Sequence, residues 1–297
     1  MTFTEKAYAK INLDLYIAGV RPDGFHELSS VMATVSLADT LTMTVSKSDR
    51  TTVSLACDAG LPTDDRNLAY RAARLFLERS GTVAALSLTL EKHIPASAGL
   101  AGGSSDAAAV LRLCHRAFPG ALSSAELFHL AAEIGSDVAF CLRGGIARCT
   151  GRGECLSPLI LPENKPLYAV LVKGSEAVST PEAFRRADTL YDGFLGNIPL
   201  PKHDADAFDA ALEGGALQTM ARLSFNMFED AVFPICPEAK AWRDRLVASN
   251  ALFARMSGSG PTVYGIFDNK NAAEEAKRTL GDVALLTTVK ATPLFVE

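Results

Sequence analysis

The segment IPASAGLAGGSSDAAAVLR, residues 94–112, places Gly99, Gly102 and Gly103 directly before an alanine-rich run. A β-rich stretch, residues 84–91, precedes it, and a Pro-Gly pair follows the alanine-rich run. This order predicts a strand, a glycine-rich turn and a helix. Unpaired backbone N–H groups and the positive end of the helix dipole meet at the start of such a helix, so the turn is suited to holding an anion.

Two familiar phosphate loops do not match this turn. Its glycine spacing differs from G-x-G-x-x-G. The G-x-x-x-x-G-K-[ST] loop requires a lysine, but no lysine lies between Lys92 and the end of the predicted helix. The glycines could also serve only a tight strand-to-helix turn with Ser104 as the N-cap. One glycine would be enough for that purpose, whereas nearly every position here carries Gly, Ala or Ser. We therefore favour polyphosphate binding.

The N-terminal residues predict β structure. Apolar and polar residues alternate over residues 7–17, which indicates a half-buried strand with Lys10 and Asn12 on its polar face. The sequence RPDGFH then predicts a turn with Phe25 and His26 at its end. Further elements are expected as follows: strands at 31–37, 41–46 and 51–57, a helix over DDRNLAYRAARLFLERS ended by Gly81, a helix from a capping box at Ser123 and Glu126 to about residue 134, and a hairpin in GGIARCTGRGECL.

A boundary between two lobes is predicted after Leu161, at PENKP. The strand LYAVLVK and a mostly helical stretch follow. The remaining residues predict a helix at 237–248, strands at 251–256 and 262–267, a helix at 271–279 and a strand at 283–290. We expect an α+β fold in two lobes, residues 1–161 and 162–297.

Composition narrows the function. The net charge of −5 and the scattered Lys and Arg residues argue against a nucleic-acid partner. No apolar run approaches the ~18 residues of a membrane span, and charged residues interrupt the apolar N-terminus, so we expect a cytoplasmic protein without a membrane partner. The six cysteines form no C-x-x-C pair and are expected to be reduced and mostly buried.

The glycine turn also resembles a family motif. PASAGLAGGSSDAAA is similar to P-x-x-x-G-L-G-G-G-S-S-[DN]-A-A, the ATP-binding motif of the galactokinase, homoserine kinase, mevalonate kinase and phosphomevalonate kinase (GHMP) superfamily. AKINLDL and MSGSGPTVYGIF match the superfamily in the expected order. Within it, KINLDLYIAGVRPDGFHEL and IGSDVAFCLRGGIARCTGRGE resemble the 4-diphosphocytidyl-2-C-methyl-D-erythritol kinase family of the non-mevalonate isoprenoid pathway. The resemblance spans most of the chain.

This resemblance implies a two-lobed GHMP kinase fold, with an N-terminal mixed α/β lobe that binds ATP, a ferredoxin-like C-terminal lobe and a cleft between them. It implies ATP and Mg²⁺ as cofactors and a small-molecule cytidine diphosphate as the acceptor, phosphorylated at its 2-hydroxyl group. We expect a monomer or a weak homodimer. The residues expected to bind ATP are Pro95, Ala96, Ser97, Ala98, Gly99, Leu100, Ala101, Gly102, Gly103, Ser104 and Ser105.

The resemblance also assigns a catalytic pair. Lys10 and Asn12 could otherwise be surface residues of a strand, and Asp137 in GSDVAF could otherwise be a turn residue before an apolar strand. In the related kinases the aspartate that matches Asp137 accepts the hydroxyl proton of the acceptor, with the lysine that matches Lys10 beside it. We therefore predict direct in-line transfer without a covalent phosphoenzyme.

The same resemblance predicts the acceptor contacts. Phe25 and His26 match positions that stack on and hydrogen-bond the cytosine, and Phe184 matches the opposing ring. Asn12 and Thr180 are expected to touch the substrate as well, although Thr180 could instead cap a helix that begins at Pro181. Without the resemblance, His26 would be a solvated turn residue and Phe184 a core residue.

Two positions depart from the family pattern: Ala101 stands where the loop commonly has glycine, and Met227 in NMFE stands where aspartate is usual. The second glycine turn, SGSGP, is expected to permit close backbone approach to the ATP loop through Gly258 and Gly260. Two other functions stay open: a kinase for mevalonate or homoserine, and a nucleotide-binding regulator without catalysis.

Overall fold

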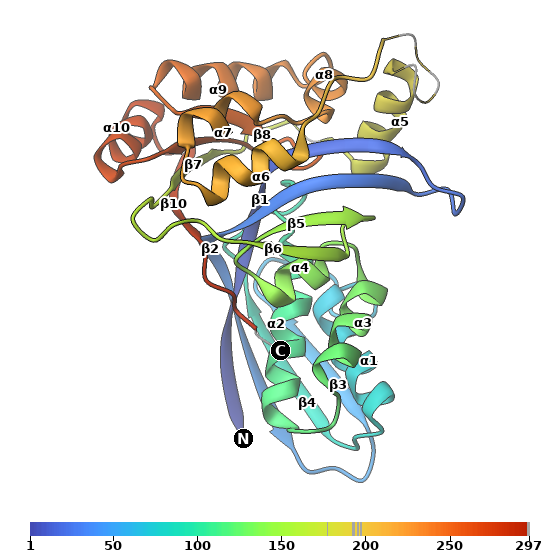
Figure 1. Cartoon of the computed structure of the whole chain (residues 1–297). Helices are drawn as coiled ribbons and strands as arrows, with labels where there is room; N and C mark the ends of the chain where they lie inside the picture. The colour runs from blue at the N-terminus through green and yellow to red at the C-terminus, as the bar shows by residue number, and fades with distance from the viewer. Residues whose placement is uncertain (177, 192–193, 195, 197, 296–297) are drawn as a thin grey trace.

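The computed structural model describes residues 1–176, 178–191, 194, 196 and 198–295. Neighbouring strands follow the order β3 (Thr52–Cys57), β4 (Ala85–Glu91), β2 (His26–Ser46), β10 (Ala284–Lys290), β7 (Tyr168–Val172), β9 (Val263–Phe267) and β8 (Phe253–Met256). The strands β1 (Thr2–Val20) and β5 (Ile146–Gly151) also pair with β2. The helices within residues 68–143, α1–α4, form one group, and those within residues 180–280, α5–α10, form another; the long strands β1 and β2 pass between the groups (Figure 1). The chain therefore has the mixed α+β architecture that the pattern predicts.

The two longest strands are β1, Thr2–Val20, and β2, His26–Ser46, which pair antiparallel. Two separate strands were predicted where β2 is continuous. The prediction was wrong because Asp39 does not break the strand, since its carboxylate accepts hydrogen bonds from the backbone N–H groups of His93 and Ile94. Hydrogen bonds from residues 54 and 55 positions further along the chain thus hold this carboxylate within the continuous strand.

The alternating pattern of β1 is confirmed for its apolar residues, which are buried, but its polar face does not lie at the surface. Lys10 is 4% exposed, Asn12 is 1% exposed and Asp14 is fully buried. These polar side chains face a covered interior, where each of them needs a partner.

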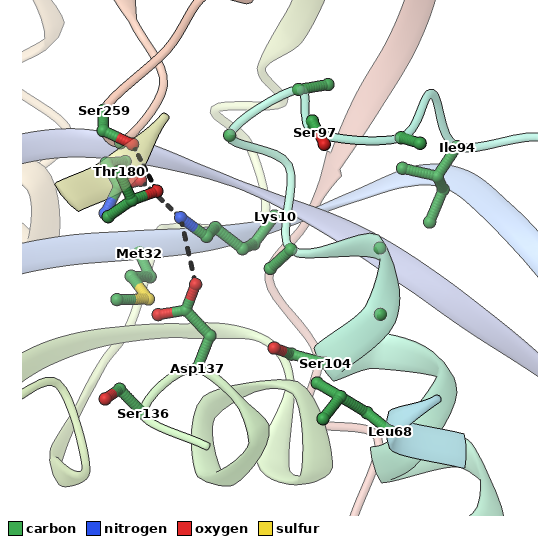
Figure 2. Close-up of a pocket in the computed structure, with 18 of the residues that line it drawn as sticks. Lys10, Met32, Leu68, Ile94, Ser97, Ser104, Ser136, Asp137, Thr180 and Ser259 are labelled. Carbon is green, nitrogen blue, oxygen red and sulfur yellow. Dashed lines mark hydrogen bonds and ion pairs between the residues drawn. The ribbon is translucent and has the colours of Figure 1, made fainter. Parts of the chain in front are cut away.

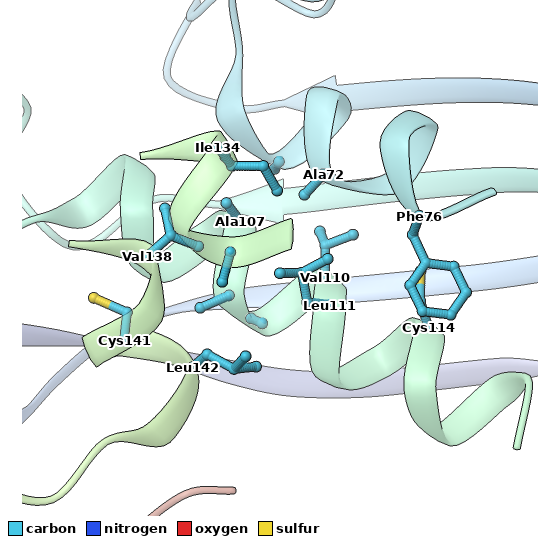
Figure 3. Packing of buried hydrophobic residues seen from close by; sticks show 14 of the residues in the cluster. Ala72, Phe76, Ala107, Val110, Leu111, Cys114, Ile134, Val138, Cys141 and Leu142 are labelled. Carbon is cyan, nitrogen blue, oxygen red and sulfur yellow. The ribbon is translucent and has the colours of Figure 1, made fainter. Parts of the chain in front are cut away.

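The first group combines the helices α1–α4 with the strands that lie next to them in the sequence. Its elements are β3 Thr52–Cys57, α1 Leu68–Ser80, β4 Ala85–Glu91, α2 Gly102–Ala117, α3 Ser124–Ile134, α4 Val138–Arg143, β5 Ile146–Gly151 and β6 Cys155–Leu159. Phe76, Leu111 and Ile134 join three of these helices in one apolar core (Figure 3). The predicted hairpin is β5–β6, and the predicted capping box of Ser123 and Glu126 begins α3.

The second group contains β7 Tyr168–Val172, α5 Thr180–Leu190, α6 Ala205–Glu213, α7 Leu217–Leu223, α8 Phe228–Val232, α9 Pro237–Ala248, β8 Phe253–Met256, β9 Val263–Phe267, α10 Lys270–Leu280 and β10 Ala284–Lys290. The strand β10 pairs with β7 on one side and with β2 on the other. It therefore connects the strands of the two groups. The boundary predicted after Leu161 stays a prediction.

Three local predictions are corrected. The residues after Asp137 form the helix α4 and not a strand. The N-cap of α2 is Ala101 and not Ser104. The helix α5 begins at Thr180 with Ser179 as its cap, so Thr180 is not the capping residue.

Two further findings concern the cysteines and the length and apolar character of the helices. All six cysteines are free thiols, and four of them are buried. None of the helices within the described ranges combines the length and the apolar character that a membrane crossing requires.

Candidate active site

A cavity of about 930 Å³ lies where β1, β2, the glycine loop, the start of α4, the start of α5 and the turn before β9 meet. Most of the predicted site residues line it: Lys10, Asn12, Phe25, His26, Pro95, Ala96, Ser97, Ala98, Gly99, Ala101, Gly102, Gly103, Ser104, Asp137, Thr180 and Phe184. Leu100 and Ser105 lie behind this wall, each 1% exposed. Segments that are far apart in the sequence thus converge on one space.

The glycine loop leaves the start of α2 open toward the cavity. Ala101, the N-cap, has φ 56° and ψ 33°, and no side chain caps the helix. Ser105 donates its hydroxyl hydrogen to the carbonyl of Gly102, so that hydroxyl points back along the loop. Because the first backbone N–H groups of a helix have no partner within it, those of α2 are available to an anion in the cavity.

Lys10 and Asp137 form an ion pair across the cavity, with Nζ and Oδ2 3.5 Å apart (Figure 2). Lys10 lies on β1 and is almost fully buried, whereas the Asp137 side chain at the start of α4 is 30% exposed. Lys10 Nζ also donates to Asn12 Oδ1 at 2.7 Å. The ammonium group is therefore held in place while one carboxylate beside it remains open to a ligand.

A chain of hydrogen bonds fixes the amide of Asn12. Its Nδ2 donates to Ser30 Oγ at 2.8 Å, and that hydroxyl donates to the carbonyl of Asp14 at 2.7 Å. Because the amide hydrogens point toward Ser30, the amide oxygen must face Lys10. The backbone N–H of Lys10 donates to the carbonyl of Leu100, which ties the same strand to the glycine loop.

The second glycine turn packs against the first, as predicted. A Cβ atom at Gly99 would lie 2.2 Å from the carbonyl oxygen of Ser257, so only glycine fits there. Ser257 Oγ also donates to the carbonyl of Gly99 at 2.9 Å. At Gly258, with φ 58°, a Cβ atom would lie 3.5 Å from Lys10 Nζ. The turn thus closes the cavity next to the lysine.

Two residues that support the site were not identified from the sequence. The first is Asn226, whose Nδ2 donates to the carbonyls of Met256 at 2.7 Å and Gly258 at 2.9 Å and so holds the second glycine turn. The adjacent Met227, where the family pattern has aspartate, is fully buried and packs in the apolar core. The family motif NMFE marked this segment, but only the structure shows which side chain supports the site.

The second residue is Lys92, which lines the cavity although the glycine loop itself carries no lysine. Its Nζ contacts Asp106 Oδ2 at 2.7 Å and also pairs with Asp39. Burial raises the pKa of Asp106 to about 7, against the opposing effect of the Lys92 ammonium group. A lysine that precedes the loop thus reaches the helix that follows it, and its Nζ passes close to Gly102, where an added Cβ atom would lie 3.4 Å away.

The aromatic residues occupy the other end of the cavity. His26 stacks on Phe184 with ring centroids 4.4 Å apart, and its Nε2 lies 2.6 Å from Asp188 Oδ1. His26 is therefore not a solvated turn residue. Phe25 is 53% exposed and offers a ring face at the cavity rim. Thr180 Oγ1 lies 2.9 Å from Ser259 Oγ, which joins α5 to the second glycine turn (Figure 2).

The sequence matches known kinases over most of its length. Residues 67–145 match the GHMP kinases N terminal domain, and residues 200–284 match the GHMP kinases C terminal domain. The 4-diphosphocytidyl-2-C-methyl-D-erythritol kinase of Acaryochloris marina is 42% identical over 280 residues, which cover 92% of this chain and 89% of that protein. The enzyme of the same name from Bacillus licheniformis is 42% identical over 266 residues, which cover 90% and 88%.

Solved structures agree with these matches. A crystal structure of 4-(cytidine 5'-diphospho)-2C-methyl-D-erythritol kinase has a TM-score of 0.79 and 35% identity, and covers 97% of this chain and 99% of its own. Mevalonate kinase from L. major, in complex with R-mevalonate, has a TM-score of 0.74 at 17% identity, and covers 100% of this chain and 98% of its own. The second match concerns the fold alone.

Proposed function

This chain belongs to the 4-diphosphocytidyl-2-C-methyl-D-erythritol kinase family of the GHMP kinases, and we propose that it transfers the γ-phosphoryl group of ATP to the 2-hydroxyl group of 4-diphosphocytidyl-2-C-methyl-D-erythritol. This reaction belongs to the non-mevalonate pathway of isoprenoid precursors. The fold is accordingly the two-lobed α+β fold that the sequence predicted.

One observation carries the proposal. The uncapped start of α2 and the ion pair of Lys10 with Asp137 face the same cavity. Phosphoryl transfer needs positioning and charge stabilisation more than strong proton abstraction, because its transition state is loose. A set of backbone N–H groups beside a lysine and an accessible carboxylate supplies both requirements.

The proposed roles follow from this geometry. The N–H groups of the glycine loop bind the phosphates of ATP and orient the γ-phosphoryl group. Asp137 accepts a hydrogen bond from the acceptor hydroxyl and takes its proton as the new P–O bond forms and the bond to ADP breaks. Lys10 holds that hydroxyl and stabilises the charge that develops on the transferred group. Transfer is direct, so no residue is phosphorylated.

The oxygen atoms of the cavity wall decide whether magnesium fits this site. The described ranges contain no group of three or more His, Cys, Asp or Glu side chains placed to hold a metal ion. The wall does offer hard oxygen donors, namely the Ser104 hydroxyl group, the Asp137 carboxylate and Asp106 Oδ1, which has no hydrogen-bond partner among the described residues. Mg²⁺ commonly binds through one or two carboxylates together with phosphates and water, so this set fits an ion that arrives with the nucleotide. When bound, Mg²⁺ would neutralise phosphate charge.

The residues at the aromatic end of the cavity favour an acceptor that contains a cytosine ring. Phe25 offers an exposed aromatic face, and aromatic stacking requires only that face. His26 is oriented by Asp188 and packed on Phe184, so its ring has one defined position. We propose that these three side chains select the base, while Asn12 and Thr180 contact the part of the acceptor nearer to Lys10.

Release of ADP tests the proposal. The protein is incubated with ATP, Mg²⁺ and, separately, 4-diphosphocytidyl-2-C-methyl-D-erythritol, mevalonate and homoserine. We expect turnover with the first acceptor. Turnover only with mevalonate or homoserine would assign the chain another acceptor, and ATP binding without turnover on any acceptor would favour a regulator.

The catalytic roles need separate variants. Lys10→Ala and Asp137→Ala should retain ATP binding, measured by calorimetry, while turnover falls by a factor of about 100 or more. Lys6→Ala, on the exposed part of the same strand, is the matched control and should keep the wild-type rate. A Lys10 or Asp137 variant with nearly wild-type turnover would refute the mechanism.

A further inference from the structure

Arg152 lies in the turn between β5 and β6 and lines the cavity at its aromatic end. Its guanidinium carbon is 5.1 Å from the centroid of the Phe25 ring. The next residue, Gly153, packs against the start of α4, since a Cβ atom there would lie 3.7 Å from the carbonyl oxygen of Ser136 and 3.9 Å from Asp137 Oδ1. The turn therefore touches both the proposed base site and the proposed site of phosphoryl transfer.

The other long cations of the cavity wall are already engaged. Lys10 contacts Asn12 and Asp137, Lys92 contacts Asp39 and Asp106, and Arg66 makes a two-pronged contact with Asp64 through Nε at 2.9 Å and Nη2 at 2.7 Å.

Arg152 differs from these cations. Its guanidinium group makes no hydrogen bond within the described ranges, and the ion pair of its Nε with Glu154 Oε1 is long, at 3.7 Å. The side chain is 34% exposed, so solvent and ligands can reach its N–H groups. The contact with the Phe25 ring is a cation–π contact, which uses none of the guanidinium N–H groups, so these remain available to a ligand.

We propose that Arg152 binds the diphosphate group of the acceptor, an assignment that rests on the proposed function. The reacting hydroxyl group must lie at Lys10 and Asp137, and the cytosine must lie at Phe25. The diphosphate joins these two parts of the acceptor, so it passes the turn that carries Arg152. A planar guanidinium group can donate two parallel hydrogen bonds to phosphate oxygens.

Steady-state kinetics of two substitutions test this assignment. Arg152→Gln should raise the KM for 4-diphosphocytidyl-2-C-methyl-D-erythritol by about 10-fold to 100-fold, because a charge-assisted contact is lost. Arg152→Lys keeps the charge but loses the planar fork, and should raise that KM by a smaller factor. The KM for ATP should change less than about twofold in both. Arg185→Gln on α5, with 65% of its side chain exposed, is the matched control for loss of a positive charge.

A binding measurement separates the diphosphate from the base. Calorimetry with CDP and with cytidine, without ATP, should show that the wild-type protein prefers CDP, and that Arg152→Gln loses most of this preference while its affinity for cytidine changes little. An equal loss of affinity for both ligands would mean that Arg152 only shapes the Phe25 pocket, and would overturn the assignment.

Three further outcomes separate the role of Arg152 from the proposed function. Wild-type turnover combined with an unchanged acceptor KM in Arg152→Gln would overturn the role of Arg152 alone. A rise in acceptor KM in Arg185→Gln equal to that in Arg152→Gln would reduce the effect to net charge, and would also overturn it. Absence of turnover by the wild-type protein would instead overturn the proposed function.

Discussion

Ala101 is predicted to strain the glycine loop. It caps α2 in the left-handed region, with φ 56° and ψ 33°, where the Cβ atom of an L-residue lies close to the following carbonyl oxygen. This conformation costs about 1–2 kcal/mol. Ala101→Gly removes that cost, but glycine gives the unfolded chain more freedom, which opposes the gain by about 0.4–1 kcal/mol. We expect the free energy of unfolding to rise by about 0.5–1 kcal/mol.

The matched control is Ala241→Gly, at an exposed position inside the helix α9. It removes the same methyl group from an ordinary helical residue, so it should lower the free energy of unfolding by about 1 kcal/mol. Thermal unfolding followed by circular dichroism measures both, with shifts of about 1–4 °C expected in opposite directions. If Ala101→Gly lowers Tm as Ala241→Gly does, the cap is not strained and the reasoning fails.

Two further predictions concern buried polar groups beside the site. Burial raises the pKa of Asp106 from 3.8 to about 7, so its contribution to stability is present below pH 4 and is lost as the pH rises toward 7. The difference in free energy of unfolding between the wild type and Asp106→Asn should therefore fall by about 2–3 kcal/mol from pH 5 to pH 8, as measured by urea titrations. If this difference between the two proteins stays constant over that pH range, the pKa of Asp106 is not raised. Asn226→Ala should lower the free energy of unfolding by about 2–4 kcal/mol, because the carbonyls of Met256 and Gly258 lose their donor. Asn226→Asp also lacks the amide donor, so urea unfolding of that variant should show a comparable loss, and wild-type stability in either variant would count against the role of Asn226.

Much of the fold was predictable because local signals and tertiary structure agree. The helix predicted at 237–248 has those bounds in the structure, since Pro237 suits the first turn of a helix. Gly81 ends α1 with φ 65°, in the conformation that favours glycine. In both cases the deciding interaction lies within a few residues of the signal.

The parts that were wrong depend on distant residues. Asp39 continues β2 because its carboxylate binds the segment that leads into the glycine loop. Lys10 and Asn12 were placed correctly on one strand face, but the burial of that face depends on the second glycine turn. Lys92 was noted only because the glycine loop lacks a lysine, and no spacing rule indicates that its side chain reaches Asp106 on the next helix.

The place of β10 has a consequence for synthesis of the chain. Val289 pairs with Val35 of β2, and the backbone N–H of Leu294 donates to the carbonyl of Arg143 at the end of α4. About 250 residues separate Val35 from its partner, so at ~5–20 residues per second the edge of β2 waits on the order of tens of seconds at the ribosome for the strand that covers it. The helix α4, which follows Asp137, likewise gains its contact with Leu294 only after that residue has been translated. The enzyme's first half therefore reaches its finished state only after the second half has been translated.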